Sequence, residues 1–457
     1  MNPTRTDRGR LLLVLALAAA VTVFTATVPL LRDFFDLRVY YGTVDTWLHH
    51  DGRIYDYRVP GTTYGFTYPP FAALVMLPMA LLPLPAAIAV SLLLNVAALA
   101  LIARVLAGRP LRDLGWYGCA LAGCGLALFE PLRDTFSFGQ VNLLLLALVL
   151  MDAWLIRTGR GRLAGWGIGL AAAIKLTPAL FIALLLITGR RRAAAVATAV
   201  AAAATGLAAW AAPGASHFYW TRAMWDTTRV GRLDYVSNQS LQGVLARLGV
   251  TDRIAWAVLV LLVMAVWAVR ARRAAARGNW TAAFALTGLT ACLVSPVTWV
   301  HHLVWLLPAF AVLVRAGHPR AAGALYATLC TSVVWLWFHD ASGVDGFLGG
   351  NLYTWITLGL LLRLPTGQPL PPRPLFRSTS ATAPAPSRAA PAMSPASPQP
   401  APSSGTAEAD SVSVPGPGSG RTRSASSDPT GSTFPVASKP QSSSSRASSY
   451  TAKPPPA

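Results

Sequence analysis

Apolar segments separated by short clusters of arginine recur along most of this chain. The first follows Arg5, Arg8 and Arg10 and covers residues 11–31, about twenty positions, which suffices to cross the hydrocarbon core of a bilayer. No convincing cleavage site follows it, so we expect a retained helix rather than a signal peptide. With 54% hydrophobic and only 12% charged residues, the chain cannot hide its apolar surface in water-soluble cores. We therefore predict an all-α polytopic membrane protein.

Further spans are expected up to residue 363, which gives about twelve membrane helices. Each of the two segments on either side of Lys175–Pro178 is too short for a full crossing. Either they form a tilted, broken hairpin, or the number of spans falls by two to about ten. The expected spans after the first are residues 84–107, 114–130, 141–156, 163–175, 178–188, 193–212, 254–270, 280–296, 301–316, 321–338 and 351–363.

The arginine clusters predict the orientation of these spans in a cell membrane. They occupy connections at residues 108–113, 157–162, 189–192, 270–277 and 315–320, which the positive-inside rule assigns to the cytoplasm together with residues 1–10. The net charge of +20 then reflects contact with anionic membrane lipids rather than binding of nucleic acid. Residues 364–457 are rich in Ser, Pro and Ala, which predicts a disordered cytoplasmic tail and places both termini inside.

Two segments on the expected outer face are long, residues 32–83 and residues 213–253. The first contains the apolar run Phe71–Leu82, which is too short to span and fits a helix at the membrane interface. The second segment has an excess of arginine, although the positive-inside rule disfavours arginine on the outer face. These arginines would bind either a lipid-linked phosphate or ordinary lipid headgroups. These arginines are Arg222, Arg229, Arg232 and Arg247. The four cysteines lie in apolar runs without a metal-ligand spacing, which indicates packing in the membrane.

Polar residues gather at the expected outer ends of the spans, which makes residues 11–363 a candidate catalytic domain. Polar groups confined to one face favour an outward-facing reaction site over a pore, whose polar lining would continue through the bilayer. The candidates are Asp36, Arg38, Tyr40, Tyr68, Arg133, Gln140, Asn142, Lys175, Asn238, Gln239, His301 and His302.

Six motifs in this region resemble glycosyltransferase family 87. They are D-L-R-V-Y from Asp36, Y-P-P-F from Tyr68, G-Q-V-N at 139–142, A-A-I-K-L-T-P at 172–178, N-Q-S-L-Q-G at 238–243 and S-P-V-T-W-V-H-H at 295–302. The resemblance implies a membrane fold of the GT-C type with its active site on the extracytoplasmic face. It implies transfer of mannose from polyprenyl-phosphate-mannose to phosphatidylinositol mannoside, lipomannan or lipoarabinomannan, through α-(1→2) linkages. A related branch transfers arabinofuranose instead, but the setting of Asp36 favours mannose.

Asp36 is the candidate general base of such a transfer. A sugar that leaves from a phosphate departs with a stabilised anion, so one carboxylate suffices to take the proton of the acceptor hydroxyl while the anomeric centre inverts. Burial would raise the pKa of Asp36 and Arg38 would lower it, and the sequence leaves this balance open. The alternative is that Asp36 only pairs with Arg32 or Arg38 at a helix end.

The remaining candidates are expected to bind the substrate, and for several of them a purely structural role is the alternative interpretation. One of His301 and His302, which point about 100° apart on a helix, would bind the donor phosphate or orient Asp36. Lys175 would bind lipid phosphate or helix-end carbonyls. The amides of Gln140, Asn142, Asn238 and Gln239 would bind sugar hydroxyls or join helices, and Arg38, Tyr40, Tyr68 and Arg133 complete the expected substrate site.

No spacing indicates a metal site or another cofactor, although some GT-C enzymes use a divalent cation. A transporter of lipid-linked sugars is the alternative from another functional class. Such a protein would show inverted repeats and broken helices near the midplane in both halves of the chain. We find no clear internal repeat, so catalysis is favoured.

Overall fold

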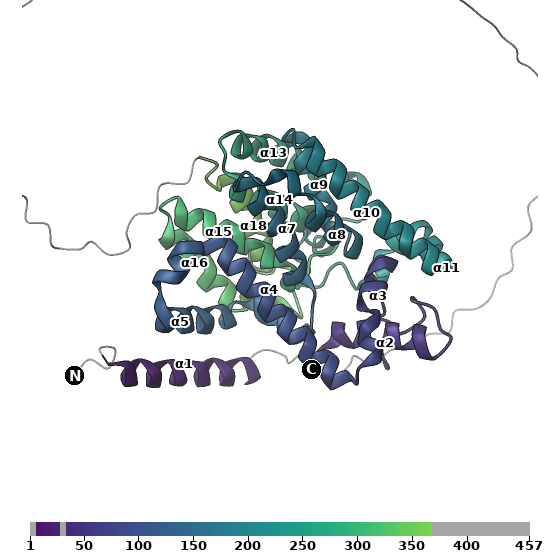
Figure 1. Cartoon of the computed structure of the whole chain (residues 1–457), viewed down its shortest axis with the longest axis horizontal. Helices are drawn as coiled ribbons and strands as arrows, with labels where there is room; N and C mark the ends of the chain where they lie inside the picture. Colours follow the sequence, from purple (N-terminus) through teal and green to yellow (C-terminus); the bar gives the residue numbers. More distant parts are fainter. Residues whose placement is uncertain (1–5, 28–32, 368–457) are drawn as a thin grey trace, which may run out of the picture. The chain divides into compact units, whose positions relative to one another are not determined.

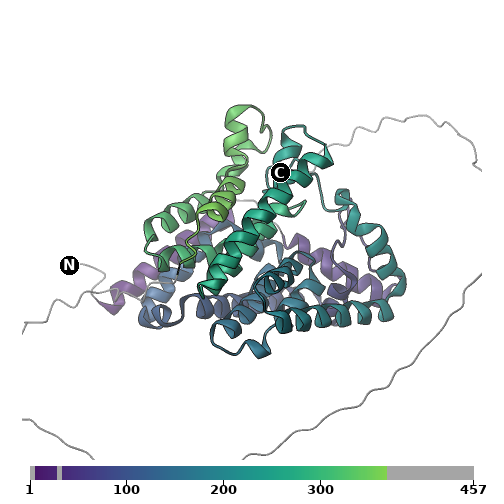
Figure 2. The ribbon, with the colours of Figure 1, turned by 90° about the horizontal axis from the view of Figure 1, so that it is seen from above.

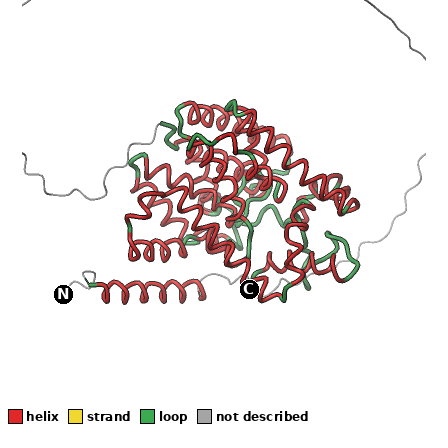
Figure 3. The backbone as a smooth tube through the Cα atoms, viewed as in Figure 1, coloured by secondary structure: helices red, strands yellow, loops and turns green. Residues whose placement is uncertain are grey.

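Helices make up nearly all the regular structure in the computed structural model, which describes residues 6–27 and 33–367 (Figure 1). No β-strand occurs within these ranges, and the one isolated bridge there joins Arg58 and Gly65 (Figure 3). The predicted all-helical fold is thus confirmed for this part of the chain. Residues 1–5, 28–32 and the predicted tail after residue 367 lie outside the described residues.

Four helices among the described residues are long and apolar enough to cross a membrane. A fifth span results if the bent pair of α6 and α7, whose axes differ by 118°, counts as one. Leu93 and Leu261 illustrate their exposed apolar surface, with exposed fractions of 69% and 68%, which suits contact with lipid. The long helices are α1 (Asp7–Thr27), α4 (Leu84–Asp113, broken at Gly108), α10 (Arg191–Ala211) and α13 (Arg253–Ala276); the pair is α6 (Glu130–Phe138) and α7 (Asn142–Arg157).

The other predicted spans occur as shorter apolar helices, so the number of about twelve is not confirmed. A helix of twelve residues rises about 18 Å, less than the thickness of about 30 Å that a crossing requires. These helices are α5 (Gly115–Leu128), α8 (Trp166–Ile174), α9 (Leu180–Ile187), α14 (Trp280–Val294), α15 (Leu306–Arg315), α16 (Pro319–Cys330) and α18 (Leu352–Arg363).

Several shorter helices lie between the predicted spans or interrupt them. The α-helices among them are α2 (Phe35–His49), α3 (Pro70–Met76), α11 (Pro213–Thr221), α12 (Leu241–Arg247) and α17 (Gly343–Gly349). The 3₁₀ helices are η2 (Leu77–Leu81), η3 (Gly161–Leu163), η4 (Thr177–Ala179), η5 (Ala223–Trp225), η6 (Thr227–Arg229), η7 (Val300–Trp305) and η8 (Val333–Trp337). Together, α3 and η2 form the short helix predicted at 71–82, beside α10 and α11 in both views (Figures 1 and 2).

The central helix of the bundle is α14, which packs against α7, α9, α13, α15 and α18. Its residues 280–293 are all buried, as expected for a helix that is apolar on every side. One of its hydroxyl groups is satisfied locally: Thr287 donates to the carbonyl of Ala283 at 2.9 Å and accepts from Trp267 Nε1 at 2.9 Å. This core supports α7 and η7, which carry part of the site.

The interruption expected around Lys175–Pro178 is present in the structure. Lys175 is extended, with φ −144° and ψ 130°, directly after α8 ends at Ile174. Pro178 lacks the backbone N–H that a continuous helix would need, and its ring restricts the preceding residue. The chain therefore passes through η4 before α9 begins, and the side chain of Lys175 lies in the gap.

Candidate active site

A cavity of about 240 Å³ brings together parts of the chain that are far apart in sequence. It is bounded by α2, by residues 64–69, by the break at 175–177, and by residues within 219–230 and 295–302. Six of the predicted site residues line it: Asp36, Tyr40, Tyr68, Gln140, Lys175 and His302.

Asp36 lies in the first turn of α2, half-buried, and faces this cavity. Gln140 donates a hydrogen bond of 2.6 Å from Nε2 to its Oδ2. Burial raises the pKa of Asp36 to about 6, and this rise is opposed by the hydrogen bond from Gln140. Arg38 does not pair with Asp36, because its Nη2 binds Asp33 Oδ2 at 3.0 Å. Asp36 is thus ionised near neutral pH and able to accept a proton.

Gly139 places Gln140 beside Asp36. Helix α6 ends in this glycine, whose φ of +68° is a left-handed conformation that residues with a side chain rarely adopt. A Cβ atom here would lie 2.6 Å from Cβ of Leu37 on α2. The close approach of the two helices therefore depends on glycine, and the next residue points its amide at the carboxylate.

Two tyrosines continue the hydrogen-bond chain from Gln140. The Tyr68 hydroxyl donates to Gln140 Oε1 at 3.0 Å and accepts from the Tyr40 hydroxyl at 3.0 Å. Both side chains are buried, and their rings pack against each other with centroids 5.5 Å apart. Asp36, Gln140, Tyr68 and Tyr40 thus form one continuous network along the wall of the cavity.

Lys175 joins this network from the break after α8. Its Nζ lies 3.2 Å from the Tyr68 hydroxyl, 3.0 Å from Asn142 Oδ1 and 2.9 Å from His302 Nε2. No carboxylate lies within ion-pair distance of Nζ among the described residues. Asp36 and Lys175 therefore face the same cavity and are joined through Tyr68 and Gln140, whereas Asp226 and Arg229 line it elsewhere.

The two adjacent histidines have different environments, as the helical geometry predicts. His302 lines the cavity, and its Nδ1 accepts from the backbone N–H of Trp299 at 3.1 Å. The ring of His301 is buried against Phe138, with centroids 5.0 Å apart, and does not line the cavity. The carbonyl of His301 accepts from Asn142 Nδ2 at 3.2 Å. His302 is thus the histidine that can contact a substrate.

Five other predicted substrate residues do not line the main cavity. Arg38 is bound to Asp33, and Arg133 donates to Ser332 Oγ at 2.6 Å. Asn142 lines a smaller cavity of about 20 Å³ next to Lys175 and His302. The remaining two, Asn238 and Gln239, are buried at the base of the loop that follows residue 229.

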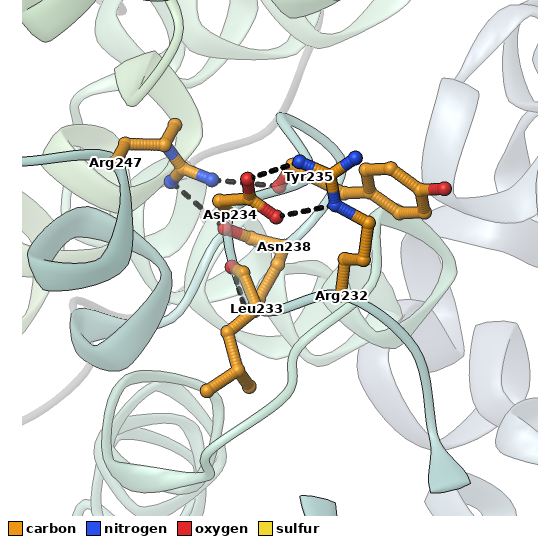
Figure 4. A network of polar contacts seen from close by, with 6 residues as sticks. All are labelled: Arg232, Leu233, Asp234, Tyr235, Asn238 and Arg247. Atoms are coloured by element: carbon orange, nitrogen blue, oxygen red, sulfur yellow. Dashed lines mark hydrogen bonds and ion pairs between the residues drawn. The ribbon is translucent and has the colours of Figure 1, made fainter. Parts of the chain in front are cut away.

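The buried amides of Asn238, which is drawn in Figure 4, and Gln239 hold that loop in place. Asn238 donates to the carbonyls of Leu233 and Pro296 and accepts from the N–H of Thr298. Gln239 donates to the carbonyl of Gly350 and accepts from the N–H of Thr354. The amides of both residues are hydrogen-bonded to the protein itself. A role in joining parts of the fold therefore fits both residues better than contact with sugar.

Arg247 completes this loop anchor. Its guanidinium donates to the carbonyls of Tyr235 and Asn238 (Figure 4). It also donates to Oδ1 of Asn351. Arg232 lies on the surface of the same loop and pairs with Asp234 at 2.6 Å.

Arg229 differs from the other arginines of the outer segment in a way that the sequence does not indicate. Of the four, Arg229 alone lines the cavity, with its guanidinium over the rings of Phe218 and Tyr55 at 5.3 and 5.9 Å. Tyr219 and Trp299 also line the cavity and were not predicted. Trp299 belongs to the motif that ends in His302, and its place in that motif is the sequence signal that could have identified it as a site residue.

No group of three or more His, Cys, Asp or Glu side chains suited to a metal ion occurs within residues 6–27 and 33–367. The arrangement instead combines a half-buried carboxylate, a buried amine and an imidazole around one cavity. Such a set can take a proton from a hydroxyl group at one end and bind an anion at the other.

Comparisons with known proteins agree with this chemistry. The model of glycosyltransferase family 87 matches residues 66–296. The chain is 35% identical over 322 residues to the polyprenol-phosphate-mannose-dependent alpha-(1-2)-phosphatidylinositol mannoside mannosyltransferase of Mycobacterium tuberculosis, covering 65% of this chain and 74% of that protein. It is 36% identical over 310 residues to the corresponding phosphatidylinositol pentamannoside mannosyltransferase of Mycolicibacterium smegmatis, covering 65% and 73%. No solved structure matches the chain. Because the family model covers half of the sequence and these relatives are matched over about three quarters of their length, the chain belongs to glycosyltransferase family 87 and is a membrane glycosyltransferase.

Proposed function

We propose that this glycosyltransferase moves mannose from polyprenyl-phosphate-mannose to a lipid-anchored mannoside and forms an α-(1→2) linkage with inversion. The acceptor is a phosphatidylinositol mannoside, lipomannan or lipoarabinomannan. The names of the two mycobacterial relatives, which specify this donor and a phosphatidylinositol mannoside acceptor, support mannose over arabinofuranose. The observation that carries the proposal is that Asp36 lines the same cavity as Lys175 and His302.

In the proposed reaction Asp36 removes the proton of the acceptor hydroxyl as its oxygen attacks the anomeric carbon of mannose. The bond between that carbon and the donor phosphate oxygen breaks, and polyprenyl phosphate leaves with the electron pair. Lys175 and His302 bind the phosphate and balance its growing negative charge. The leaving group is a stable anion, so the mechanism needs no second carboxylic acid.

We further propose a GT-C type fold with about twelve spans, the cavity on the extracytoplasmic face and both termini in the cytoplasm. The distribution of arginine supports this orientation, since the basic connections lie at the opposite ends of the spans from the cavity residues. A cysteine introduced at Gly61, in the loop after α2, tests it. An impermeant maleimide should label it in intact cells; labelling that requires permeabilised cells would place the loop inside.

The proposed activity is tested with membranes that contain the wild-type protein or Asp36→Asn. They are incubated with radiolabelled polyprenyl-phosphate-mannose and a mannoside acceptor, and the lipid products are analysed for α-(1→2) linkage. Wild-type membranes should form the product, and the variant should lose at least a hundredfold in rate. Undiminished transfer by Asp36→Asn would remove the base assignment. A wild type that transfers to none of several acceptors but moves the lipid across vesicles would favour the transporter.

A further inference from the structure

The hydrogen bonds of Lys175 leave no room for a third proton on its amine. Nζ has three polar partners, the Tyr68 hydroxyl at 3.2 Å, Asn142 Oδ1 at 3.0 Å and His302 Nε2 at 2.9 Å. A charged ammonium group carries three donors and no acceptor, whereas an uncharged amine carries two donors and one lone pair. The direction of each hydrogen bond therefore reports the charge of the lysine.

Two of the three partners accept from Lys175. Asn142 uses its Nδ2 to donate to the carbonyl of His301, so its Oδ1 faces the lysine and must accept. Gln140 uses its Nε2 to donate to Asp36, so its Oε1 must take the proton of the Tyr68 hydroxyl. Tyr68 can then only accept from Lys175, and both amine protons are used.

The third partner, His302, is a donor. Its Nδ1 faces the backbone N–H of Trp299 at 3.1 Å, and because a backbone N–H only donates, Nδ1 carries no proton. A neutral imidazole with a bare Nδ1 has its proton on Nε2, the atom that lies 2.9 Å from Lys175. An ammonium group in that position would face another N–H, whereas an uncharged amine accepts this hydrogen bond.

We infer that Lys175 is an uncharged amine in this arrangement and takes up one proton when the phosphodiester of the donor binds. This inference rests on the proposed function. An anion removed from water needs a cation beside it, and an amine whose protons both face Asn142 and Tyr68 offers it none. Protonated Lys175 and the Nε2–H of His302 would then both donate to the phosphate oxygens.

The proton taken up matters for the transfer step. A phosphodiester carries one negative charge, and the protonated lysine balances it. When the bond to mannose breaks, polyprenyl phosphate gains a second charge while Asp36 receives the acceptor proton, so the total charge of the site is unchanged. The other titratable groups that face Lys175 are Asp36, Tyr68, Cys292 and His302. Among these groups, Asp36 also titrates near neutral pH. The experiment must therefore distinguish proton uptake by Lys175 from proton uptake by Asp36.

Isothermal titration calorimetry on the purified full chain tests this inference, with farnesyl methyl phosphate as the probe. This phosphodiester does not itself titrate between pH 6 and 9, so proton uptake is assigned to the protein. Titrations at pH 7.5 in two buffers with different ionisation enthalpies should give an uptake of about one proton per ligand bound. Wild-type binding without proton exchange would overturn the inference and leave the proposed transfer intact. Wild-type protein that neither binds the probe nor transfers mannose would instead remove the proposed function.

Three variants assign the proton. Asp36→Asn should retain the uptake, which separates Lys175 from the carboxylate. Lys175→Gln should bind the probe at least tenfold more weakly and take up no proton. His302→Ala opens the third position of the amine to water, so Lys175 becomes charged before the ligand arrives and binding should proceed without uptake. Retained uptake in His302→Ala, or loss of uptake in Asp36→Asn, would contradict the hydrogen-bond argument even where all proteins fold.

Discussion

Gln140 donates a hydrogen bond of 2.6 Å to the carboxylate of Asp36, from a position 104 residues further along the chain. The same side chain accepts from Tyr68, which in turn contacts Lys175. A single amide thus connects the candidate base with the candidate phosphate ligand. The relationship has consequences for the pH dependence, stability and tolerance to substitution of this enzyme.

The rate of transfer should fall in acid as Asp36 is protonated. Its pKa is raised to about 6, so the ionised base predominates at pH 7. Well below pH 6 the ionised fraction of Asp36, and with it the rate, falls about tenfold per pH unit. Initial rates of mannose transfer at subsaturating acceptor between pH 5 and 8 would measure this limb. The residual activity of Asp36→Asn should lack it, and an unchanged wild-type rate at pH 5 would contradict the assignment.

Asp36→Asn should make the protein more stable at neutral pH while it removes activity. Because the pKa in the folded protein is raised above 3.8, the folded state binds more protons than the unfolded state, and stability is lost as the pH rises through about 6. Asparagine keeps an acceptor for Gln140 and removes the buried charge. We expect the apparent melting temperature at pH 7.5 to rise by about 1–3 °C. At pH 5 the difference should be smaller, and it should disappear below about pH 3.8, where the carboxyl is protonated in the folded and the unfolded state alike.

Much of the site could be predicted because the chemistry that it needs is rare in apolar sequence. Asp36, Tyr68 and Lys175 stand out as polar groups beside long hydrophobic runs, and each lines the cavity. The break near Lys175 followed from the two apolar segments around it, each of which is too short for a full crossing. The amide side chains were harder to interpret, because nothing in the local sequence distinguishes the role of Gln140 from that of Gln239. Gln140 donates to Asp36, whereas Gln239 donates to a backbone carbonyl in the loop anchor.

The helices that hold the site were harder to predict. Helices α2 and α6 are short and carry polar residues, so their sequences resemble connections between spans. The contact between Leu37 and Gly139 that joins them depends on tertiary packing, which no local pattern encodes. The number of spans is also poorly encoded, because several predicted spans are helices too short to cross a membrane alone.

Gln140→Leu should shift the acid limb to higher pH and lower the rate by about tenfold to a hundredfold. The hydrogen bond from Gln140 lowers the pKa of Asp36, so its removal lets burial raise that pKa further. Gln239→Leu is the matched control, since it removes a buried glutamine amide away from the cavity. This control should lower the melting temperature and leave the midpoint of the acid limb unchanged. Equal shifts of the limb in both variants would mean that Gln140 acts through the fold.

Gly139→Ala should reduce activity strongly. Alanine is strained at a φ of +68° by about 1–2 kcal/mol, and its Cβ would push α6 away from Leu37 on α2. Gln140 would then lose its alignment with Asp36. Transfer rate and melting temperature should both fall, whereas Gly206→Ala, in the interior of α10 with open space around a new Cβ, should leave both unchanged or raise stability. Full activity of Gly139→Ala would show that the helix contact tolerates displacement.

Arg247→Met should destabilise the protein far more than Arg232→Met, although both arginines belong to the same network (Figure 4). Arg247 is mostly buried and donates to the carbonyls of Tyr235 and Asn238 and to Asn351, so its loss strands several buried acceptors at a cost of about 3 kcal/mol.

Arg232 is largely exposed, and its pair with Asp234 contributes about 0–1 kcal/mol because water and salt screen the attraction. Thermal unfolding of the two detergent-solubilised variants at low and high salt would separate the contributions. Arg247→Met should melt several degrees lower at either salt concentration, since its partners are shielded from the solvent, and Arg232→Met should remain close to the wild type. Similar losses in the two variants would mean that the anchor of the loop lies at its surface rather than at Asn351.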